Sequence, residues 1–289
     1  MTRYRLGMAA FFLLLSFHAG AWRFAVTGDS RGSDQGVNRD VLTRLTVALL
    51  DEAPALVLFS GDLVDGTGDD ETVTAQMLTW RGLFMEPLQN AGIPVYPVRG
   101  NHDLSDKAWD TAFSGAYALP GNGPRGERNR TYTFTYENAR FFGLDCYASL
   151  LAYERVNVCW LARQLRGNDQ PLVFAFAHVP AFPVLHPDSL GLHFFAREAF
   201  WNVLGLSEAR YYFCGHDHFF DDSTAHDWFG HTLHQVIAGT AGAPEYTWSG
   251  HPLSPRLTTL QHNETSGYVI VDVEDEDTCF SFVPLDKGP

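Results

Sequence analysis

The first part of the chain alternates short apolar runs with segments of helical periodicity. The apolar runs at 23–27, 55–60 and 94–98 are typical of buried strands, and a glycine follows each within two residues. Between them, residues 37–50 repeat apolar positions with the spacing of an amphipathic helix, and 72–91 predict a second helix that ends at Gly92. Strands joined by helices pair in parallel, so this order predicts an α/β fold.

The second part of the chain is richer in predicted strands. Runs at 131–136 and 140–146 flank a turn-like Glu137-Asn138-Ala139 and predict a hairpin. Helices are predicted at 160–165 and 196–204. Later strands are predicted at 172–177, 209–214, 233–238, 268–273 and 278–283. No repeat or long linker divides the sequence, so we expect a single domain over residues 22–289.

Residues 1–21 have the pattern of a secretory signal peptide. Arg3 and Arg5 precede an apolar run at 6–17, and Ala19-Gly20-Ala21 offers small residues at the positions that a signal peptidase recognises. A membrane anchor is the alternative, but a spanning helix needs ~20 apolar residues and this run is shorter. We therefore predict cleavage after Ala21 and export to the periplasm or the extracellular space.

Export would permit disulfide bonds among the 4 cysteines. Cys146 and Cys159 are close in the chain and flank a loop, which makes them the preferred pair. Four buried free thiols are the alternative, because a free cysteine packs as a small apolar residue.

Five short polar motifs follow predicted strands. They are Gly28-Asp29-Ser30-Arg31, Gly61-Asp62-Leu63-Val64-Asp65, Gly100-Asn101-His102-Asp103, His178-Val179-Pro180 and Gly215-His216-Asp217-His218. Ligands of open α/β sheets bind beyond the carboxyl ends of the strands, so we expect these side chains at one edge. Asp, Asn and His without thiolate suit Mn, Fe, Zn, Co or Ni. Each motif alone is more often a turn, or a buried histidine whose hydrogen bonds are satisfied within the core. The inference of a metal site rests on the ordered set of five motifs.

The ordered motifs resemble the calcineurin-like metallophosphoesterase superfamily, which includes the purple acid phosphatases. Segments 122–124, 132–134, 142–145 and 238–244 also resemble family segments, so the likeness covers essentially the whole mature chain. It implies a four-layer αββα sandwich of two mixed β-sheets with helices outside. It also implies two divalent or trivalent metal ions (Mn, Fe, Zn or similar) and hydrolysis of a phosphate ester by a metal-bound hydroxide.

The resemblance also implies a role for each motif residue. Six residues would bind metal: Asp62 as the bridge, Asp29 and His218 at the first ion, and Asn101, His178 and His216 at the second. Asn101 and His102 would contact the substrate.

Two further residues of the third motif would act in catalysis. His102 would protonate the leaving oxygen or stabilise its charge. Asp103 would orient His102, with a loop-capping aspartate as an equal alternative.

One motif departs from the common family pattern, in which Asp-x-His follows the first strand. Arg31 stands where that histidine would bind the first metal, and Asp65 stands where purple acid phosphatases have a tyrosine ligand. We expect the first metal to take a water, to bind weakly or to recruit a spare histidine: His186, His193, His226, His231 or His234. An arginine fork suits a phosphate oxygen, so Arg31 is predicted to bind substrate. A surface arginine paired with an acid is the alternative.

Composition and charge narrow the classes of function. A chain with 45% hydrophobic and 14% aromatic residues is not intrinsically disordered. Its formal charge of −14 disfavours a nucleic-acid platform and an anionic membrane surface. We expect a phosphomonoesterase whose cleft is bordered by residues 114–130 and 182–193. A phosphodiesterase acting on nucleotides or lipids is the alternative enzyme, and a metal-depleted binding protein is the alternative of another class. The oligomeric state stays open.

Overall fold

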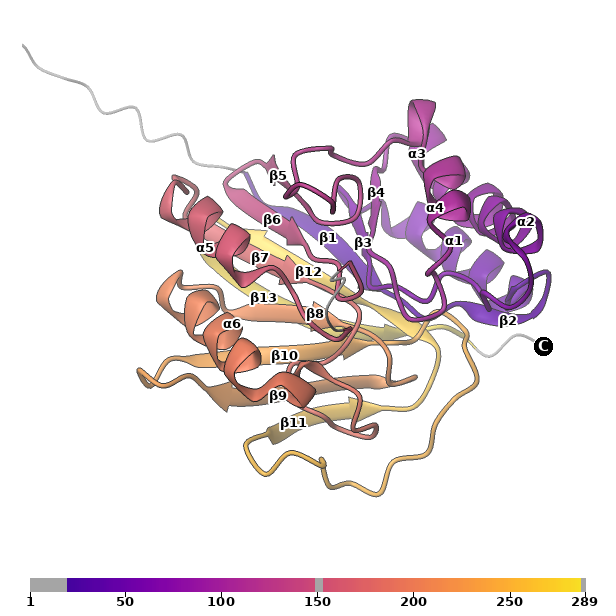
Figure 1. Cartoon of the computed structure of the whole chain (residues 1–289). Coiled ribbons are helices and arrows are strands. Elements are labelled where there is room, and N and C mark those ends of the chain that lie inside the picture. Colours follow the sequence, from indigo (N-terminus) through magenta and orange to yellow (C-terminus); the bar gives the residue numbers. More distant parts are fainter. Residues whose placement is uncertain (1–19, 149–152, 287–289) are drawn as a thin grey trace, which may run out of the picture.

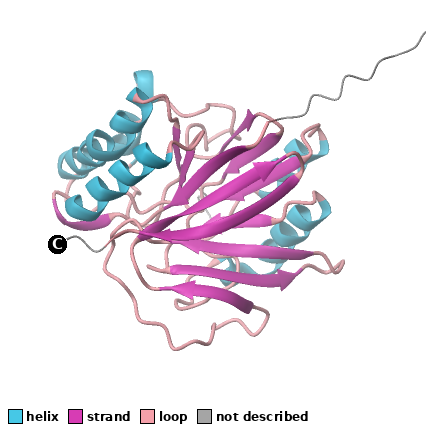
Figure 2. Cartoon of the chain, turned by 180° about the vertical axis from the view of Figure 1, so that it is seen from behind, coloured by secondary structure: helices cyan, strands magenta, loops and turns pink. Residues whose placement is uncertain are grey.

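Two β-sheets pack against each other between two groups of helices in the computed structural model, which describes residues 20–148 and 153–286 (Figure 1). Helices α1 to α4 cover the outer face of one sheet, and α5 and α6 cover the outer face of the other. Seen from behind, the same two helical layers flank the strands (Figure 2). The predicted four-layer αββα sandwich is confirmed.

The first sheet has the order β13-β12-β1-β3-β4. Its centre is parallel, as the strand–helix alternation predicts, while β12 and β13 run antiparallel. The strands are β1 (Trp22–Thr27), β3 (Val57–Phe59), β4 (Val95–Pro97), β12 (Gly267–Glu274) and β13 (Asp277–Pro284). Strand β2 (Arg31–Asp34) lies outside both sheets and bridges to Val37.

The second sheet has the order β11-β9-β10-β8-β7-β6-β5. Strands β6, β7, β8 and β10 are parallel; β5, β9 and β11 pair antiparallel with their neighbours. The bounds are β5 (Tyr132–Tyr136), β6 (Ala139–Gly143), β7 (Leu172–Phe176), β8 (Tyr211–Cys214), β9 (Phe220–His226), β10 (Thr232–Ala238) and β11 (Thr258–Asn263).

The helices begin at side-chain caps that the sequence supplies. Asn38 and Asp69 accept backbone hydrogen bonds at the starts of α1 and α2, as Ser105 does at α4. A π-helical turn (Arg81–Met85) continues α2 into α3, so the predicted helix 72–91 is nearly unbroken. The helices are α1 (Arg39–Glu52), α2 (Asp70–Trp80), α3 (Glu86–Asn90), α4 (Asp106–Ala112), α5 (Val158–Arg166) and α6 (Phe194–Leu206), with 3₁₀ turns at Gly115–Tyr117 and Leu190–His193.

Aromatic side chains fill the space between the two sheets. The ring of Phe24 on β1 lies 5.2 Å from Phe141, 4.9 Å from Phe174 and 6.0 Å from Phe213, which belong to three strands of the other sheet. All four rings are buried. Edge-to-face contacts of this kind add to the free energy gained by burying the rings, so this core fixes one sheet against the other.

The predicted disulfide is wrong, because all four cysteines, each within the described residues, are free thiols. Cys146 is buried after β6, whereas Cys159 is exposed on α5. The alternative of four buried free thiols is correct for Cys146 and Cys214, which are buried, and wrong for Cys159 and Cys279, which are exposed.

Most of the predicted leader, residues 1–19, lies outside the described residues, so its cleavage stays a prediction. Among the helices of residues 20–148 and 153–286, none has the length and apolarity needed to cross a bilayer.

Candidate metal centre

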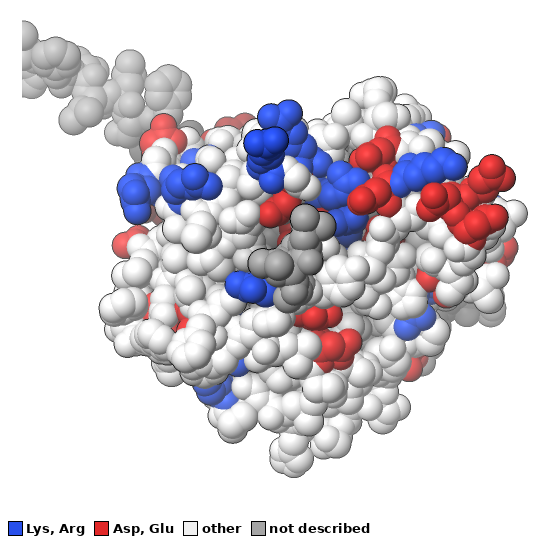
Figure 3. All heavy atoms as spheres, in the orientation of Figure 1, with Lys and Arg blue, Asp and Glu red and all other residues white. Residues whose placement is uncertain are grey.

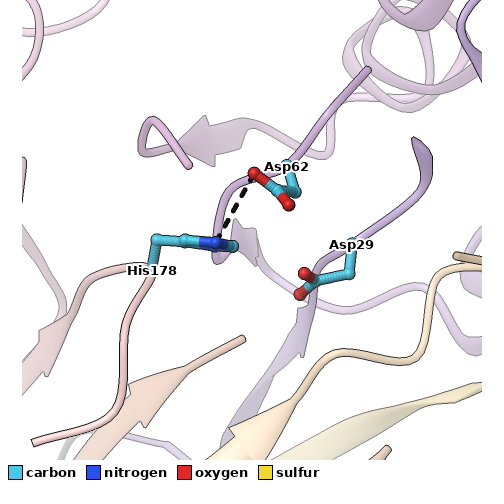
Figure 4. A group of neighbouring side chains, drawn as sticks. All are labelled: Asp29, Asp62 and His178. Carbon is cyan, nitrogen blue, oxygen red and sulfur yellow. Dashed lines mark ion pairs between the residues drawn. The ribbon is translucent and has the colours of Figure 1, made fainter. Parts of the chain in front are cut away.

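The five polar motifs meet where strands β1, β3, β4, β7 and β8 end. Figure 4 shows Asp29, Asp62 and His178, which follow β1, β3 and β7, turned toward one another. Oxygen atoms of the two carboxylates and a ring nitrogen of His178 lie within 4.8 Å of one another, and all three residues are buried. The sheet edge therefore gathers the side chains that the motifs predict.

The six predicted metal ligands fall into two groups around Asp62. On one side, His178 Nε2 lies 3.5 Å from Asp62 Oδ1 and 3.0 Å from Asn101 Oδ1. His216 Nδ1 lies 3.2 Å from both Asn101 Oδ1 and His178 Nε2. On the other side, His218 Nε2 lies 3.7 Å from Asp29 Oδ1. The six ligands that the family resemblance implies therefore lie close together, and Asp62 lies within 4.8 Å of both Asp29 and His178.

Hydrogen bonds on the outer side of the His178 and His218 rings leave the Nε2 lone pairs facing the centre of the site. His178 Nδ1 donates to the carbonyl of Ser60 at 2.8 Å, and His218 Nδ1 donates to the carbonyl of Pro244 at 2.7 Å. In the neutral rings, each Nε2 is then an acceptor. His178 Nε2 faces the acceptor oxygens of Asn101 and Asp62 with no proton between them. Such convergence of lone pairs fits a bound cation.

The charges of the site point the same way. Burial, with the nearby charge of Asp62 added, holds the pKa of Asp29 well above its ordinary value. Burial lowers the pKa of His178 and of His218 to about 4, so both rings are neutral at physiological pH. Two buried carboxylates among neutral imidazoles are costly unless a cation is shared between them. The donor set therefore fits a metal centre.

Backbone conformation at the site depends on glycine and on strained residues. Asp29, Asp62 and His216 all adopt positive φ, which non-glycine residues rarely do and which is concentrated at functional sites. A Cβ atom on Gly100 would lie 2.1 Å from Asp62 Oδ1, and one on Gly215 would lie 2.1 Å from Asp29 Oδ2. Glycine at these positions lets the backbone approach the carboxylates closely.

The structure separates the roles predicted for His102 and Asp103. His102 Nδ1 donates to the carbonyl of Asp65 at 2.6 Å, and His102 Nε2 lies 4.0 Å from Asp62 Oδ2. The buried Asp103 carboxylate instead accepts from the backbone N–H groups of Leu63 and Gly100. The Asp65 carbonyl therefore orients His102, and Asp103 makes the contacts of the loop-capping alternative.

A small cavity of about 180 Å³ opens above the centre. Three of its lining residues lie outside the family motifs: His186, Asp188 and Tyr246. The others are Arg31, Asp62, Asn101, His102, His216 and His218. The border predicted at 182–193 contributes His186 and Asp188, whereas 114–130 contributes no residue to this lining. The sequence gives no sign that Tyr246 lies at the site, because this tyrosine is not part of any of the five polar motifs.

Of the five spare histidines, His186 is the one that lines this cavity. Its Nδ1 pairs with the buried carboxylate of Asp217. The other four contact groups elsewhere: His193 with Tyr153, His226 with Thr232, His231 with Asp227, and His234 with Asp222.

Asp188 lies beside the second ligand group. Its Oδ2 is 3.1 Å from His216 Nε2, on the side of the ring opposite the Nδ1 atom that faces Asn101. The contact with His216 lowers the pKa of Asp188 to about 2, so the carboxylate is ionised. A carboxylate behind a metal-binding imidazole fixes the ring and raises its basicity.

Charged side chains of both signs share the outer surface. On the face seen in Figure 3, Lys and Arg are interspersed with Asp and Glu along the upper edge. Arg130, for example, pairs with both Asp106 and Asp110.

Comparison with known proteins establishes the family. The sequence model of the calcineurin-like phosphoesterases (Metallophos) matches residues 23–220, more than half of the chain. The chain therefore belongs to this family of phosphoesterases. Among curated proteins, none matches the chain.

Solved structures with similar folds include three from different organisms. The purple acid phosphatase PPD1 from yellow lupin (Lupinus luteus) seeds has a TM-score of 0.68 and 16% identity, over 94% of this chain and 52% of that one. This chain thus spans about half the length of the lupin protein. GAP50, the anchor in the inner membrane complex of Plasmodium, has a TM-score of 0.61 and 16% identity, over 94% and 87%.

The third structure is a dimetal phosphatase from Danio rerio, with a TM-score of 0.57 and 16% identity, over 92% of this chain and 99% of that one. At such identities the three likenesses show a shared fold.

Proposed function

We propose that this chain is an exported phosphomonoesterase that uses two metal ions. The convergence of six oxygen and nitrogen donors in two groups around Asp62 carries the proposal of two ions. The leader pattern of residues 1–21 supports export. The ions would be held by Asp29, Asp62, Asn101, His178, His216 and His218.

The size of the cavity favours a monoester. At about 180 Å³, it is smaller than the ~300–1,000 Å³ of typical small-molecule pockets. It has room for a phosphoryl group, while both substituents of a diester would require more space. A monoester dianion also carries one more negative charge than a diester, and Arg31 adds a cation at the wall of the cavity.

Arg31 would bind a phosphoryl oxygen of the substrate. Its Nε is buried without a hydrogen-bond partner and lies 3.7 Å from Asp62 Oδ2. Its Nη2 donates to the hydroxyl of Tyr246 at 3.4 Å. A guanidinium with an unused buried donor, beside the carboxylate that would bridge the metals, suits an anionic substrate.

His102 would act on the leaving group. Because its Nδ1–H is engaged by the carbonyl of Asp65, its Nε2 is the atom available at the cavity. A protonated Nε2 would pass its proton to the leaving oxygen. When bound, the metal ions supply a water of lowered pKa as nucleophile and neutralise charge on the phosphoryl oxygens.

The test combines metal analysis of the purified protein with a panel of phosphate monoesters, diesters and nucleotides, each assayed with Mn, Fe, Zn or Mg. Asp62→Asn should lose both bound metal and hydrolysis. Asp40→Asn, at an exposed site on α1, is the control and should retain both. Hydrolysis of diesters in preference to monoesters would refute the monoester assignment, and the absence of all hydrolysis would refute the function.

A further inference from the structure

Tyr246 contacts two residues of the centre from a loop that carries none of the family motifs. Its ring stacks on His218, with 4.1 Å between ring centroids and 10° between planes. Its hydroxyl accepts the hydrogen bond from Arg31 Nη2 at 3.4 Å. One side chain therefore links the arginine that would bind substrate to a histidine of the first metal group.

The loop before Tyr246 is anchored to the same site. The N–H of Ala241 donates to the carbonyl of Gly28 at 2.7 Å, and the N–H of Ala243 donates to the carbonyl of Asp29 at 2.8 Å. The carbonyl of Pro244 then accepts from His218 Nδ1. Backbone contacts thus fix the loop to the first motif and hold the edge of the His218 ring whose face Tyr246 covers.

Arg31 needs the hydrogen bond from its guanidinium to Tyr246 because the carboxylate of Asp62 also attracts the guanidinium. The Asp62 carboxylate attracts the guanidinium, and the Nε atom has no hydrogen-bond partner. The hydroxyl of Tyr246 binds Nη2 of the guanidinium and so keeps this atom on the side of the cavity. The arginine is then presented to a phosphoryl oxygen instead of collapsing onto Asp62.

We propose that Tyr246 is a positioning residue for substrate recognition: its hydroxyl directs Arg31 toward the phosphoryl group, and its ring fixes His218 at the first metal. The inference rests on the proposed phosphomonoesterase function.

The experiment separates the two contacts by using five variants, one of them the Arg31→Ala background itself. Tyr246→Phe removes the hydroxyl and keeps the stacked ring, so KM for a monoester should rise about fivefold, with kcat and bound metal unchanged. In an Arg31→Ala background, Tyr246→Phe should have no further effect. Tyr246→Leu also removes the stacked ring, so it should weaken the retention of one metal ion during dialysis against a chelator. Tyr153→Phe, on a tyrosine that does not line the cavity, is the control.

Two kinds of failure are distinguishable. If the wild-type protein hydrolyses no monoester, the proposed function fails. If the wild-type protein is active but Tyr246→Phe leaves KM unchanged, lowers metal content, or raises KM equally in the Arg31→Ala background, the role of Tyr246 is overturned. Tyr246→Phe removes one oxygen from a half-buried side chain, so it keeps the test valid even if Tyr246→Leu does not fold.

Discussion

Replacing Asp103 with alanine tests how the loops that follow β3 and β4 are held together. The buried carboxylate accepts hydrogen bonds from the N–H of Leu63, at 3.1 Å to both oxygens, and from the N–H of Gly100 at 2.9 Å. The N–H of Val64 makes a longer contact of 3.4 Å. Alanine would leave the first two donors buried without an acceptor, in the loops that position Asp62 and the other ligands nearby.

The magnitude follows from these contacts. A buried donor without a partner costs about 1–3 kcal/mol, so two donors cost about 2–6 kcal/mol. Part of this loss is offset because the carboxyl group is itself unfavourable to bury: burial and the charge of Asp62 raise the pKa of Asp103 to about 8. We therefore expect the free energy of unfolding to fall by about 2–4 kcal/mol. For a protein of this size, such a change lowers Tm by roughly 5–15 °C.

The assay is thermal and urea unfolding after removal of metal with a chelator, so that ligand binding does not mask the change. Asp103→Asn retains a carbonyl acceptor and should fall between the wild type and Asp103→Ala. Asp69→Ala removes an exposed cap of α2 and should lower the free energy of unfolding less than Asp103→Ala does. If Asp103→Ala unfolds like the wild type but has a reduced kcat, the loop-capping account is refuted, and the orientation of His102 by Asp103 is supported.

Three further predictions address the site and the thiols. Gly100→Ala should abolish metal binding, measured by elemental analysis, because its Cβ would overlap the Asp62 carboxylate; full metal content would contradict this. Asp188→Asn should weaken metal affinity about 10–100-fold, because it releases the ring of His216. Glu154→Gln is the control: it removes a charge from a nearby half-buried acid and should leave the metal affinity unchanged. Equal losses of affinity in the two variants would refute the positioning role of Asp188. Alkylation of the native protein, read by mass spectrometry, should label the exposed Cys159 and Cys279 and leave the buried Cys146 and Cys214 unlabelled. Burial also raises the pKa of Cys146 to about 12, which keeps this thiol protonated and unreactive. Labelling of all four thiols, or of none, would contradict this assignment.

Some strands could not be predicted from their own sequences. Strand β9 contains Asp221, Asp222 and Ser223, all buried, so it lacks the apolar run that marks a strand. Neighbours bind several of their polar atoms: His234 contacts Asp222, and the hydroxyl of Ser223 contacts both Asp221 and Thr259. The strand forms because β10 and β11 pair with it on both sides, which is information carried by distant residues.

Strand β11 and helix α4 were missed for related reasons. Strand β11 (Thr258–Asn263) lies at the edge of its sheet, is mostly polar and contains a bulge, so alternation of apolar residues is weak. Helix α4 (Asp106–Ala112) has seven residues, too few for a clear helical period. Packing against α2 and the Ser105 cap, more than intrinsic propensity, hold such a short helix in place.

The residues alone indicate which segments form the central strands and which polar side chains follow their carboxyl ends. Apolar runs that end at glycine are local signals, and the polarity of the motifs follows directly from the residues. From these, the parallel pairing of the strands in the first part of the chain could be predicted, and the resemblance of the motifs indicated the family and the six candidate ligands.

The tertiary structure decided which atoms face one another. The orientation of His102 by the Asp65 carbonyl, the support of Arg31 by Tyr246 and the contact of Asp188 with His216 each join side chains from separate loops. Their geometry depends on how the two sheets pack through the aromatic core. A contact between distant segments leaves no local pattern in the chain, so the site's donors could be predicted from the sequence, but the supports around them required the fold.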